Sequence, residues 1–500
     1  MSLATTKAIA LSGLNGDVIT VEVDIADGLP GYTLLGLPDA ALSESRDRVR
    51  AALVNSLQPW PNRKVTIALL PAWLPKAGSG FDLPIAMCLL GAQGVVQGVE
   101  ELLFVGELSL DGSLRHTRGV LPSLICAFRN GIRKVVIPKA NLAEAKLLPE
   151  LEVLAFDALK DVVHWMQTGE ITEQSEFDLE LEINEKSLDF SDVAGQRAAR
   201  RAAEISAAGS HNFLMIGPPG VGKTMIAERM PTILPPLTQE ETLEVSAIHS
   251  ITNSNRAVLS TTAPFIAPHH STTRIAMVGG GAYVIKPGVC SLAHRGVLFV
   301  DEAPECASGV LDSLRQPLEN GSITISRATG NLTFPAKFIL VLAANPCPCG
   351  KFAGKGFGCI CTSVQVRRYL NKLSGPLLDR IDLRVNVENV SRIELAETQN
   401  ESSQQIRNRV IAAREIAANR FKHEKWRLNS EIPPRALRQQ YQPIREAMNF
   451  LHDELDKEKI TARGLHKIII TSWTIADLNG VDRPTLTEVT ESYRLREGIE

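Results

Sequence analysis

One stretch of eight residues, GPPGVGKT, constrains this chain more than any other. It follows the apolar run Phe213–Ile216, which predicts a buried strand, and precedes Met225–Met230, which predicts the start of a helix. In this context glycines let successive backbone N–H groups turn toward one anion, and the helix start adds the positive end of its dipole. We therefore expect Lys223 to reach the outer phosphates of a nucleoside triphosphate and the Thr224 hydroxyl to hold Mg²⁺. The predicted binding loop comprises Gly217, Pro218, Pro219, Gly220, Val221, Gly222, Lys223 and Thr224.

The length and composition of the chain indicate a globular protein with several domains. Its 500 residues exceed one ordinary core, so two to four domains are expected. No apolar run approaches the roughly eighteen residues of a membrane span, and the first residues show no signal-peptide pattern, so we expect a cytoplasmic protein without membrane contact. Because the formal net charge is only −3, any surface that binds nucleic acid must be local.

Residues 1–168 predict a compact α+β domain. The runs Val18–Asp24 and Lys64–Leu70 predict strands, and Pro84–Leu90 and Pro122–Arg129 predict helices. After them, residues 169–188 carry seven acidic residues and one lysine, which predicts a solvated linker.

The remaining chain predicts an α/β nucleotide-binding core at 189–390 and a helical lid at 391–500. Within the core, the apolar run Gly296–Val300 ends in Asp301 and Glu302. Asp301 is expected to complete the Mg²⁺ shell, and Glu302 is expected to orient and deprotonate the attacking water. Two carboxylates at the end of a buried strand need a cation partner, because burying them alone is costly.

Three further residues lie in segments that resemble motifs of the AAA+ family. Members of this family bind and hydrolyse ATP. Asn345 follows the apolar strand pattern Phe338–Ala344 and matches the polar residue that senses the γ-phosphate. Arg380 in LLDRID matches the arginine that reaches a neighbour's active site, and Arg463 in TARGLHKI resembles the lid arginine that contacts the γ-phosphate. An arginine that acts in trans implies a homo-oligomer, which in this family is a hexameric ring. The alternative for Arg380 is a surface ion pair with a neighbouring aspartate.

The N-terminal domain resembles the proteolytic domain of Lon proteases. The similar segments are PKAGSGFDLPIA at Pro75–Ala86, VGELSLDG at Val105–Gly112 and GIRKVVIP at Gly131–Pro138. That family uses a Ser–Lys dyad, but the serine position falls on Gly80 and the lysine position on Leu121. The resemblance therefore implies the fold without the catalytic dyad. A shifted dyad at Ser79, and with it an ATP-dependent protease, is the disfavoured alternative.

Insertions in the nucleotide-binding core narrow the resemblance. The segment APHHSTTR lies between the two nucleotide motifs, and the alternating pattern over 321–335 predicts a β-hairpin. With PCPCG and SGPLLDRID, they resemble the magnesium chelatase-like AAA+ proteins, and more narrowly the ComM/YifB group, whose members join a Lon-like domain to this module. The resemblance implies an ATP-driven DNA motor, a helicase that promotes branch migration when transforming DNA is integrated by homologous recombination. The alternative is a magnesium chelatase-type motor subunit that remodels a protein partner.

Basic residues on predicted loops and hairpin tips are candidates for DNA contact: Arg274, Lys286, Arg327, Lys351 and Lys355. Such residues either face the phosphates of DNA in a central pore or are ordinary solvated turn residues. The adjacent His269 and His270 predict polar loop contacts rather than a metal pair.

Four cysteines form two C-x-C pairs within fifteen residues: Cys347, Cys349, Cys359 and Cys361. Four thiolates suit tetrahedral Zn²⁺, and the glycine-rich segment between the pairs allows the chain to fold back. Pro346 and Pro348 favour a turn, which lets the thiols converge. The sequence leaves two interpretations open, a zinc site and a loop that only carries thiols, while disulfides are disfavoured in the cytosol.

Overall fold

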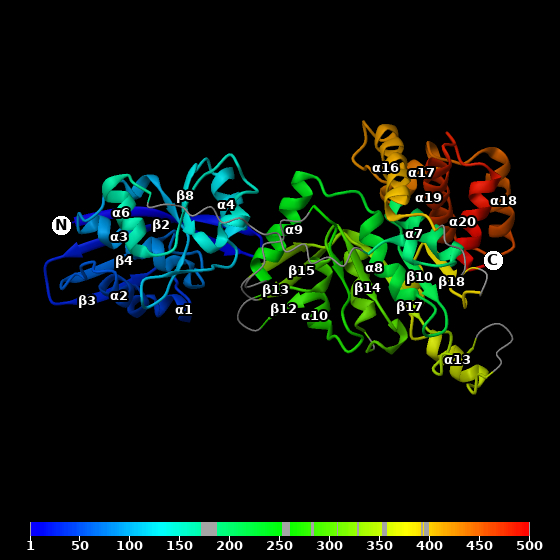
Figure 1. Ribbon diagram of the computed structural model, residues 1–500, viewed down its shortest axis with the longest axis horizontal. Helices are drawn as coiled ribbons and strands as arrows, with labels where there is room; N and C mark the ends of the chain where they lie inside the picture. The colour runs from blue at the N-terminus through cyan, green and yellow to red at the C-terminus, as the bar shows by residue number, and fades with distance from the viewer. Residues whose placement is uncertain are drawn as a thin grey trace. The chain divides into compact units, whose positions relative to one another are not determined.

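The computed structural model describes residues 2–171, 188–252, 261–281, 285–307, 309–327, 330–352, 358–391, 394 and 400–499 (Figure 1). The chain folds into two compact units, Met1–Ile183 with Gln239–Ser260, and Asn184–Thr238 with Thr261–Glu500. Both units combine helices with a sheet, so the predicted α/β multidomain class is confirmed. Most of the predicted acidic linker lies outside the described residues.

The first unit is built on a seven-stranded sheet of order β3-β4-β2-β1-β5-β8-β9. Its strands are β1 (Ser2–Ser12), β2 (Asn15–Ala26), β3 (Gly31–Leu35), β4 (Lys64–Leu70), β5 (Leu103–Phe104), β8 (Lys134–Pro138) and β9 (Glu152–Phe156). β1 and β2 form a long antiparallel hairpin in the register Ser2↔Ile25, whereas β8 and β9 are parallel. A small hairpin, β6 (Glu107–Leu108) with β7 (Leu114–Arg115), lies outside this sheet.

Both faces of this sheet are buried, because successive side chains of a strand point to opposite faces. In β8, Val136 joins one apolar core, and Val135 and Ile137 join a second. Helix α3 (Asp82–Ala92) belongs to the first core and α4 (Val120–Arg129) to the second. The other α-helices among residues 2–171 are α1 (Ala40–Ser43), α2 (Ser45–Asn55), α5 (Leu142–Ala145) and α6 (Leu159–Thr168).

A helix from within the predicted nucleotide-binding core completes the first unit. α9 (Gln239–Thr252) packs on α4, and Ala247 enters the apolar core that α4 helps to form. The Ser250 hydroxyl donates to Glu144 Oε2 at 2.5 Å, and the Ser250 carbonyl accepts from the Gly119 N–H at 3.0 Å. The range 189–390 therefore contains a helix whose packing partners lie in the first unit.

The second unit is built on a five-stranded parallel sheet of order β11-β14-β17-β10-β18. Its strands are β10 (Phe213–Ile216), β11 (Phe265–Ile266), β14 (Val297–Val300), β17 (Ile339–Ala344) and β18 (Leu383–Asn386). Their almost continuously apolar sequences are typical of parallel strands that are covered on both faces. Helices α7 (Arg197–Gly209) and α8 (Lys223–Ile233) share one apolar core with β10, β14 and β17.

Two hairpins and several short helices decorate this sheet. β15 (Ser322–Arg327) pairs with β16 (Gly330–Pro335) in the register Ser322↔Pro335, so the predicted hairpin is confirmed. β12 (Gly279–Gly280) pairs with β13 (Lys286–Pro287). The short helices are α10 (Arg274–Val278), α11 (Val289–Leu292), α12 (Arg315–Asn320), α13 (Ser363–Leu370) and α14 (Gly375–Leu378).

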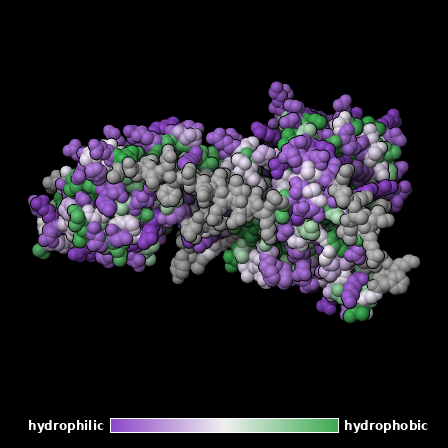
Figure 2. Space-filling view, in the orientation of Figure 1, coloured by the Kyte–Doolittle hydropathy of each residue, from purple (hydrophilic) through white to green (hydrophobic). Residues whose placement is uncertain are grey.

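The C-terminal part is helical, as predicted. Its helices are α16 (Ser403–Arg420), α17 (Pro434–Gln439), α18 (Arg445–Asp456), α19 (Ala462–Asn479) and α20 (Leu486–Glu497). They enclose a small core of their own around Phe421, Leu451 and Trp473. Among the described residues, no helix is long and apolar enough to cross a membrane. On the face in Figure 2, hydrophobic residues are scattered among hydrophilic ones.

Candidate functional site

The glycine-rich loop connects β10 to α8, beside the end of β17. The Gly217 N–H donates to the Ala344 carbonyl at 3.1 Å, and a Cβ atom on Gly217 would lie 2.2 Å from the Val387 carbonyl oxygen. Gly220 and Gly222 have φ angles of +80° and +97°, in the left-handed region that favours glycine. The loop thus ends directly in the N-terminus of an eleven-residue helix, where backbone N–H groups lack partners within the helix.

Lys223 is the first residue of α8, and its ammonium group lies within the loop. Its Nζ donates to the carbonyls of Gly217 at 2.6 Å and Pro218 at 2.8 Å, and to Asn345 Oδ1 at 3.2 Å. Burial lowers the pKa of this ammonium group, and nearby carboxylates oppose the shift. The structure therefore brings together the lysine of the first motif and the asparagine of the third strand.

A hydroxyl and a carboxylate meet at the predicted magnesium position. Thr224 Oγ1 donates to Asp301 Oδ2 at 3.0 Å, and the other oxygen of Asp301 accepts from the Glu302 N–H at 2.8 Å. Oxygen ligands of this kind, few in number and completed by phosphate and water, fit the coordination of Mg²⁺. Glu302 has a φ of +48°, which is uncommon for a residue with a side chain.

His270 lies against Glu302, the carboxylate predicted to activate water. The sequence predicted only polar loop contacts for this histidine. His270 Nδ1 is 3.3 Å from Glu302 Oε2, and the rings of His269 and His270 are 4.0 Å apart between centroids. β11 and β14 are parallel neighbours, so residues that follow them reach the same edge of the sheet. The contact between His270 and Glu302 could not be predicted, because the sequence does not show that β11 and β14 are neighbours in the sheet.

The two predicted arginines gather around one carboxylate. Arg380 forms an ion pair with Glu319 and also donates to the Pro376 carbonyl. Arg463 Nη2 lies 3.4 Å from the same Glu319 Oε1, and its Nη1 lies 3.8 Å from Asp379 Oδ2. Arg463 thus lies with Arg380, whereas Lys223 bonds to loop carbonyls and Asn345. The partner of Arg380 is Glu319 rather than the neighbouring aspartates considered from sequence.

Three of the predicted DNA-contacting residues are exposed on neighbouring elements of the second unit. Arg274 begins α10, Lys286 lies in β13, and Arg327 ends β15. Arg327 donates to the carbonyl of Gly281, which lies beside β12, so the two hairpins meet. Lys351 is also exposed. Lys355 lies outside the described residues.

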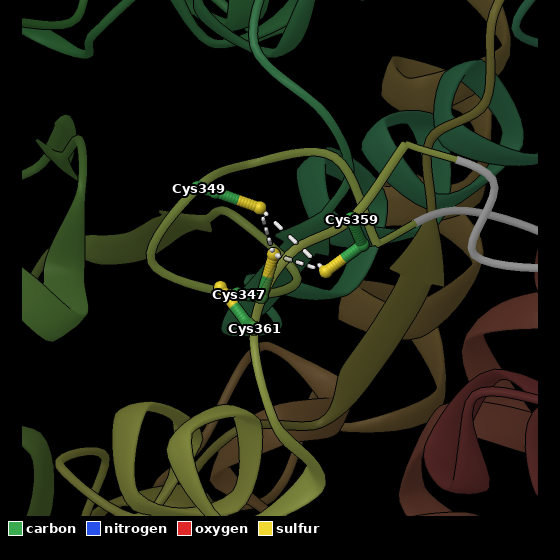
Figure 3. Close-up of side chains that lie close together, drawn as sticks. All are labelled: Cys347, Cys349, Cys359 and Cys361. Carbon is green, nitrogen blue, oxygen red and sulfur yellow. Dashed lines mark hydrogen bonds between the residues drawn. The ribbon is translucent and has the colours of Figure 1, made fainter.

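The four clustered cysteines converge (Figure 3). The sulfur of Cys347 lies 3.3 Å from that of Cys349 and 3.7 Å from that of Cys359, and the last two sulfurs are 3.6 Å apart. With Cys361 included, all four sulfur atoms lie within 4.8 Å of one another. A hydrogen bond from the Lys351 backbone contributes most to lowering the pKa of the Cys349 thiol to about 6.

The Lon-like positions of the first unit carry no Ser–Lys pair. Gly80 lies in a short 3-10 helix (Ser79–Phe81) directly before α3, and Leu121 is buried in α4. The Ser79 hydroxyl donates to the Glu107 carboxylate, while Lys76 Nζ donates to a backbone carbonyl. The side-chain partner of Ser79 is therefore an acid instead of a lysine.

The fold and the site together define a P-loop nucleotide-binding module of the AAA+ class, joined to an α/β unit. Three family models match most of the chain. Their descriptions are "Magnesium chelatase, subunit ChlI" at 189–395, "Subunit ChlI of Mg-chelatase" at 21–141 and "Magnesium chelatase, subunit ChlI C-terminal" at 400–496.

Whole-chain relatives identify the family. An uncharacterised protein of Mycobacterium tuberculosis is 44% identical over 99% of each chain. The competence protein ComM of Haemophilus influenzae is 39% identical over 98% of this chain and 97% of its own, and the uncharacterised protein YifB of Escherichia coli is 41% identical over 99% and 97%. A Lon protease of Roseiflexus castenholzii is 29% identical over 30% of this chain and 19% of its own. The chain belongs to the ComM/YifB family of magnesium chelatase-like AAA+ proteins. Membership implies ATP and Mg²⁺ as ligands.

Proposed function

We propose that this protein is an ATP-driven DNA motor, a helicase that promotes branch migration while transforming DNA is integrated by homologous recombination. The relative named competence protein ComM, similar over nearly its whole length, supports this role. The structural observation that carries the proposal is the division of the hydrolytic groups into two sets. Lys223 and Asn345 lie in one set, and Arg380 and Arg463 lie around Glu319 in the other.

The first set performs the hydrolytic chemistry in this proposal. Lys223 exchanges its loop carbonyls for phosphate oxygens and stabilises the charge that develops on them. Thr224 and Asp301 hold Mg²⁺, which when bound neutralises the same oxygens. Glu302 orients the attacking water and accepts its proton, and His270 restrains the carboxylate that does so. Asn345 contacts the γ-phosphate and the lysine together.

The second set acts on a neighbouring subunit. Arg380 and Arg463 are held by Glu319 until a neighbour's γ-phosphate competes for their guanidinium groups. A contact in which one surface of each subunit meets a different surface of the next either closes into a ring or continues as a filament, and we propose a closed hexameric ring. Each hydrolytic site then consists of a phosphate loop from one subunit and two arginines from the next.

The two hairpins provide the DNA contact in this proposal. Exposed Arg274, Lys286 and Arg327 supply positive charge from neighbouring elements, although the chain as a whole carries a formal charge of −3. Arg327 uses one N–H on the Gly281 carbonyl, which leaves further donors for phosphate. Lys351 and Lys355, which lie in the sequence between the two cysteine pairs, are proposed as additional contacts.

Mixing two inactive variants tests the composite site and the DNA activity together. We expect Lys223→Ala and Arg380→Ala each to abolish DNA-stimulated ATP hydrolysis and branch migration on three-stranded DNA. A 1:1 mixture should recover ATP hydrolysis, because about a quarter of random interfaces then pair an intact loop with an intact arginine. If the mixture stays inactive while both variants assemble, Arg380 does not act in trans. If DNA neither stimulates hydrolysis nor is unwound by the wild type, the DNA-motor proposal fails.

The descriptions of the matching family models favour one second candidate, a magnesium chelatase-type motor that remodels a protein partner. This candidate predicts ATP hydrolysis that is indifferent to DNA and rises with a protein partner. The wild-type arm of the same experiment separates the two candidates, because only the DNA motor displaces a strand.

A further inference from the structure

The four clustered thiols have the spacing of a tetrahedral metal site. With Zn–S bonds of about 2.3 Å, tetrahedral geometry places ligand sulfurs about 3.8 Å apart. The three measured separations are 3.3, 3.7 and 3.6 Å. A disulfide requires an S–S distance of about 2.05 Å, so none of these pairs is a disulfide.

Local backbone structure explains how two C-x-C pairs converge. In an extended strand the side chains at i and i+2 share one face but start about 6.6 Å apart, and nothing brings two separated pairs together. Here the Gly350 N–H donates to the Cys347 carbonyl at 2.9 Å, and Gly350 has a φ of +73°, so residues 347–350 form a turn that contains both Cys347 and Cys349. The second pair, Cys359 and Cys361, directly precedes Thr362, the N-cap of α13. The two pairs are thus held by the end of β17 and the start of α13, and their sulfurs face one another (Figure 3).

We propose that these four thiolates bind one structural Zn²⁺ ion. Four protein ligands complete the tetrahedral shell and leave no position for water or substrate, which is the form of a structural rather than a catalytic zinc site. Cys347 is fully buried and the other three cysteines are half-buried. The same donors suit iron in a single-iron tetrathiolate site, and metal analysis separates the two ions.

The zinc site also braces the candidate nucleotide site, an inference that rests on the proposed ATPase function. Asn345 is two residues before Cys347, and its side chain accepts from Lys223. A Cβ atom on Gly350 would lie 2.7 Å from Pro219 Cδ, so the metal-bound turn packs against the phosphate loop. The cysteines are therefore positioning residues that fix the end of β17 and the turn beside Pro219.

Metal content of the full-length protein tests the site directly. Protein purified under reducing conditions without chelator should contain about one zinc per chain by mass spectrometric metal analysis. Cys349→Ser and Cys361→Ser should lose it, while Cys306→Ser, a half-buried cysteine outside the cluster, should retain it. Zinc-free wild-type protein, or one iron per chain, would overturn the proposal.

A second measurement covers serine variants that fail to fold. Titration of the wild type with a mercurial thiol reagent should release its zinc to a chromogenic chelator after about four thiols have reacted. Cobalt exchanged into the site should show the visible bands of a tetrahedral tetrathiolate complex. Zinc release without thiol modification, or an octahedral cobalt spectrum, would contradict the assigned ligands.

The bracing role has its own readout. In folded Cys349→Ser protein the turnover number for ATP should fall about tenfold, while the affinity for a fluorescent ATP analogue changes little, because Lys223 and the loop N–H groups remain. Unchanged turnover in zinc-free protein would refute the bracing role and leave the zinc site standing. Failure of DNA to stimulate hydrolysis would refute the proposed motor without changing the zinc content.

Discussion

Glu144 of the first unit and Lys223 of the second are both buried, but the hydrogen-bond partners of their charges differ in kind. In the first unit, the buried Glu144 carboxylate accepts from the Leu121 N–H at 3.1 Å and from the Ser250 hydroxyl at 2.5 Å, and Asn141 donates to its other oxygen at 3.1 Å. In the second unit, the equally buried Lys223 ammonium group is bonded only to neutral oxygen atoms in the described hydrogen bonds.

This difference separates structure from chemistry. A charge whose partners are complete stabilises a fold, because its desolvation is compensated by hydrogen bonds. A buried cation held only by neutral oxygens retains unmet attraction for an anion, and the glycine-rich loop and the start of α8 around Lys223 suit a phosphate as that anion. Leu121 is the position predicted to match the dyad lysine of Lon proteases, and its N–H belongs to the hydrogen-bond network of Glu144. The first unit thus uses the Lon-like position for packing, and the second keeps its charge available.

The largest expected difference in ATP turnover is between substitution of Lys223 in the phosphate loop and substitution of Ser79 in the Lon-like domain. Lys223→Ala should lower ATP turnover by a factor of about 100 or more, because one charged donor to the transferred phosphate is lost. Ser79→Ala should leave ATP turnover unchanged. Neither the wild type nor this variant should degrade casein, because Ser79 bonds to Glu107 and not to a lysine. Turnover with saturating ATP and a casein degradation assay measure both. Casein cleavage that disappears in Ser79→Ala would break the comparison.

Removing the Glu144 carboxylate tests the structural side of the comparison. Glu144→Ala leaves the Leu121 N–H and the Ser250 hydroxyl unpaired, so the free energy of unfolding of the first unit should fall by about 3 kcal/mol. Amide hydrogen exchange should rise in α9, which Ser250 anchors. Glu152→Ala is the matched control, because its ion pair with Lys134 is exposed and the expected loss is below about 0.5 kcal/mol. Unchanged protection of α9 would show that apolar packing alone holds it.

Acid should weaken the second unit through one buried histidine. His211 is fully buried, bonds through Nε2 to Thr474 Oγ1 at 2.7 Å, and has a pKa lowered from 6.5 to about 4 mainly by burial. A lowered histidine pKa means that the neutral form is favoured in the fold. Its contribution is therefore complete above pH 6.5 and is lost as the pH falls toward 4, at a cost of about 3 kcal/mol.

Denaturation measured at several pH values checks the expected acid effect. His211→Gln, which cannot take up the proton, should flatten the pH dependence of the free energy of unfolding between 6.5 and 4. An equally steep curve for His211→Gln would assign the acid effect to other groups.

Sequence predicted the parts of the site that are local and missed those that depend on the strand order. The glycine loop, Lys223 and Thr224 are contiguous, so their geometry follows from one strand, one turn and one helix. The contact of His270 with Glu302 arises only because β11 and β14 are neighbours. Arg463 was recognised by its motif, but its place beside Arg380 depends on how α19 packs.

The position of α9 shows the same limit at the scale of a domain. Its sequence, QEETLEVSAIHSIT, indicates a helix with apolar residues but does not say which core receives them. Only five residues separate it from α8, the helix that begins with Lys223, and yet Ala247 packs in the first unit. Proximity in sequence to a nucleotide motif therefore did not determine the unit to which the helix belongs.

The smallest expected effects concern Lys286 and Arg327, the basic residues of the two hairpins. They are proposed to bind the phosphates of DNA, whereas Lys223 is proposed to bind those of ATP. Lys286→Ala and Arg327→Ala should each weaken DNA binding several-fold, uniformly across sequences, and reduce the slope of log affinity against log salt by about 1. Exposed charges contribute little to stability, so unfolding should be unaffected. Arg445→Ala, in a helix of the C-terminal core, is the control of equal charge. If it weakens binding as much as the hairpin variants, then DNA responds to overall charge, and the hairpins are ordinary solvated turns.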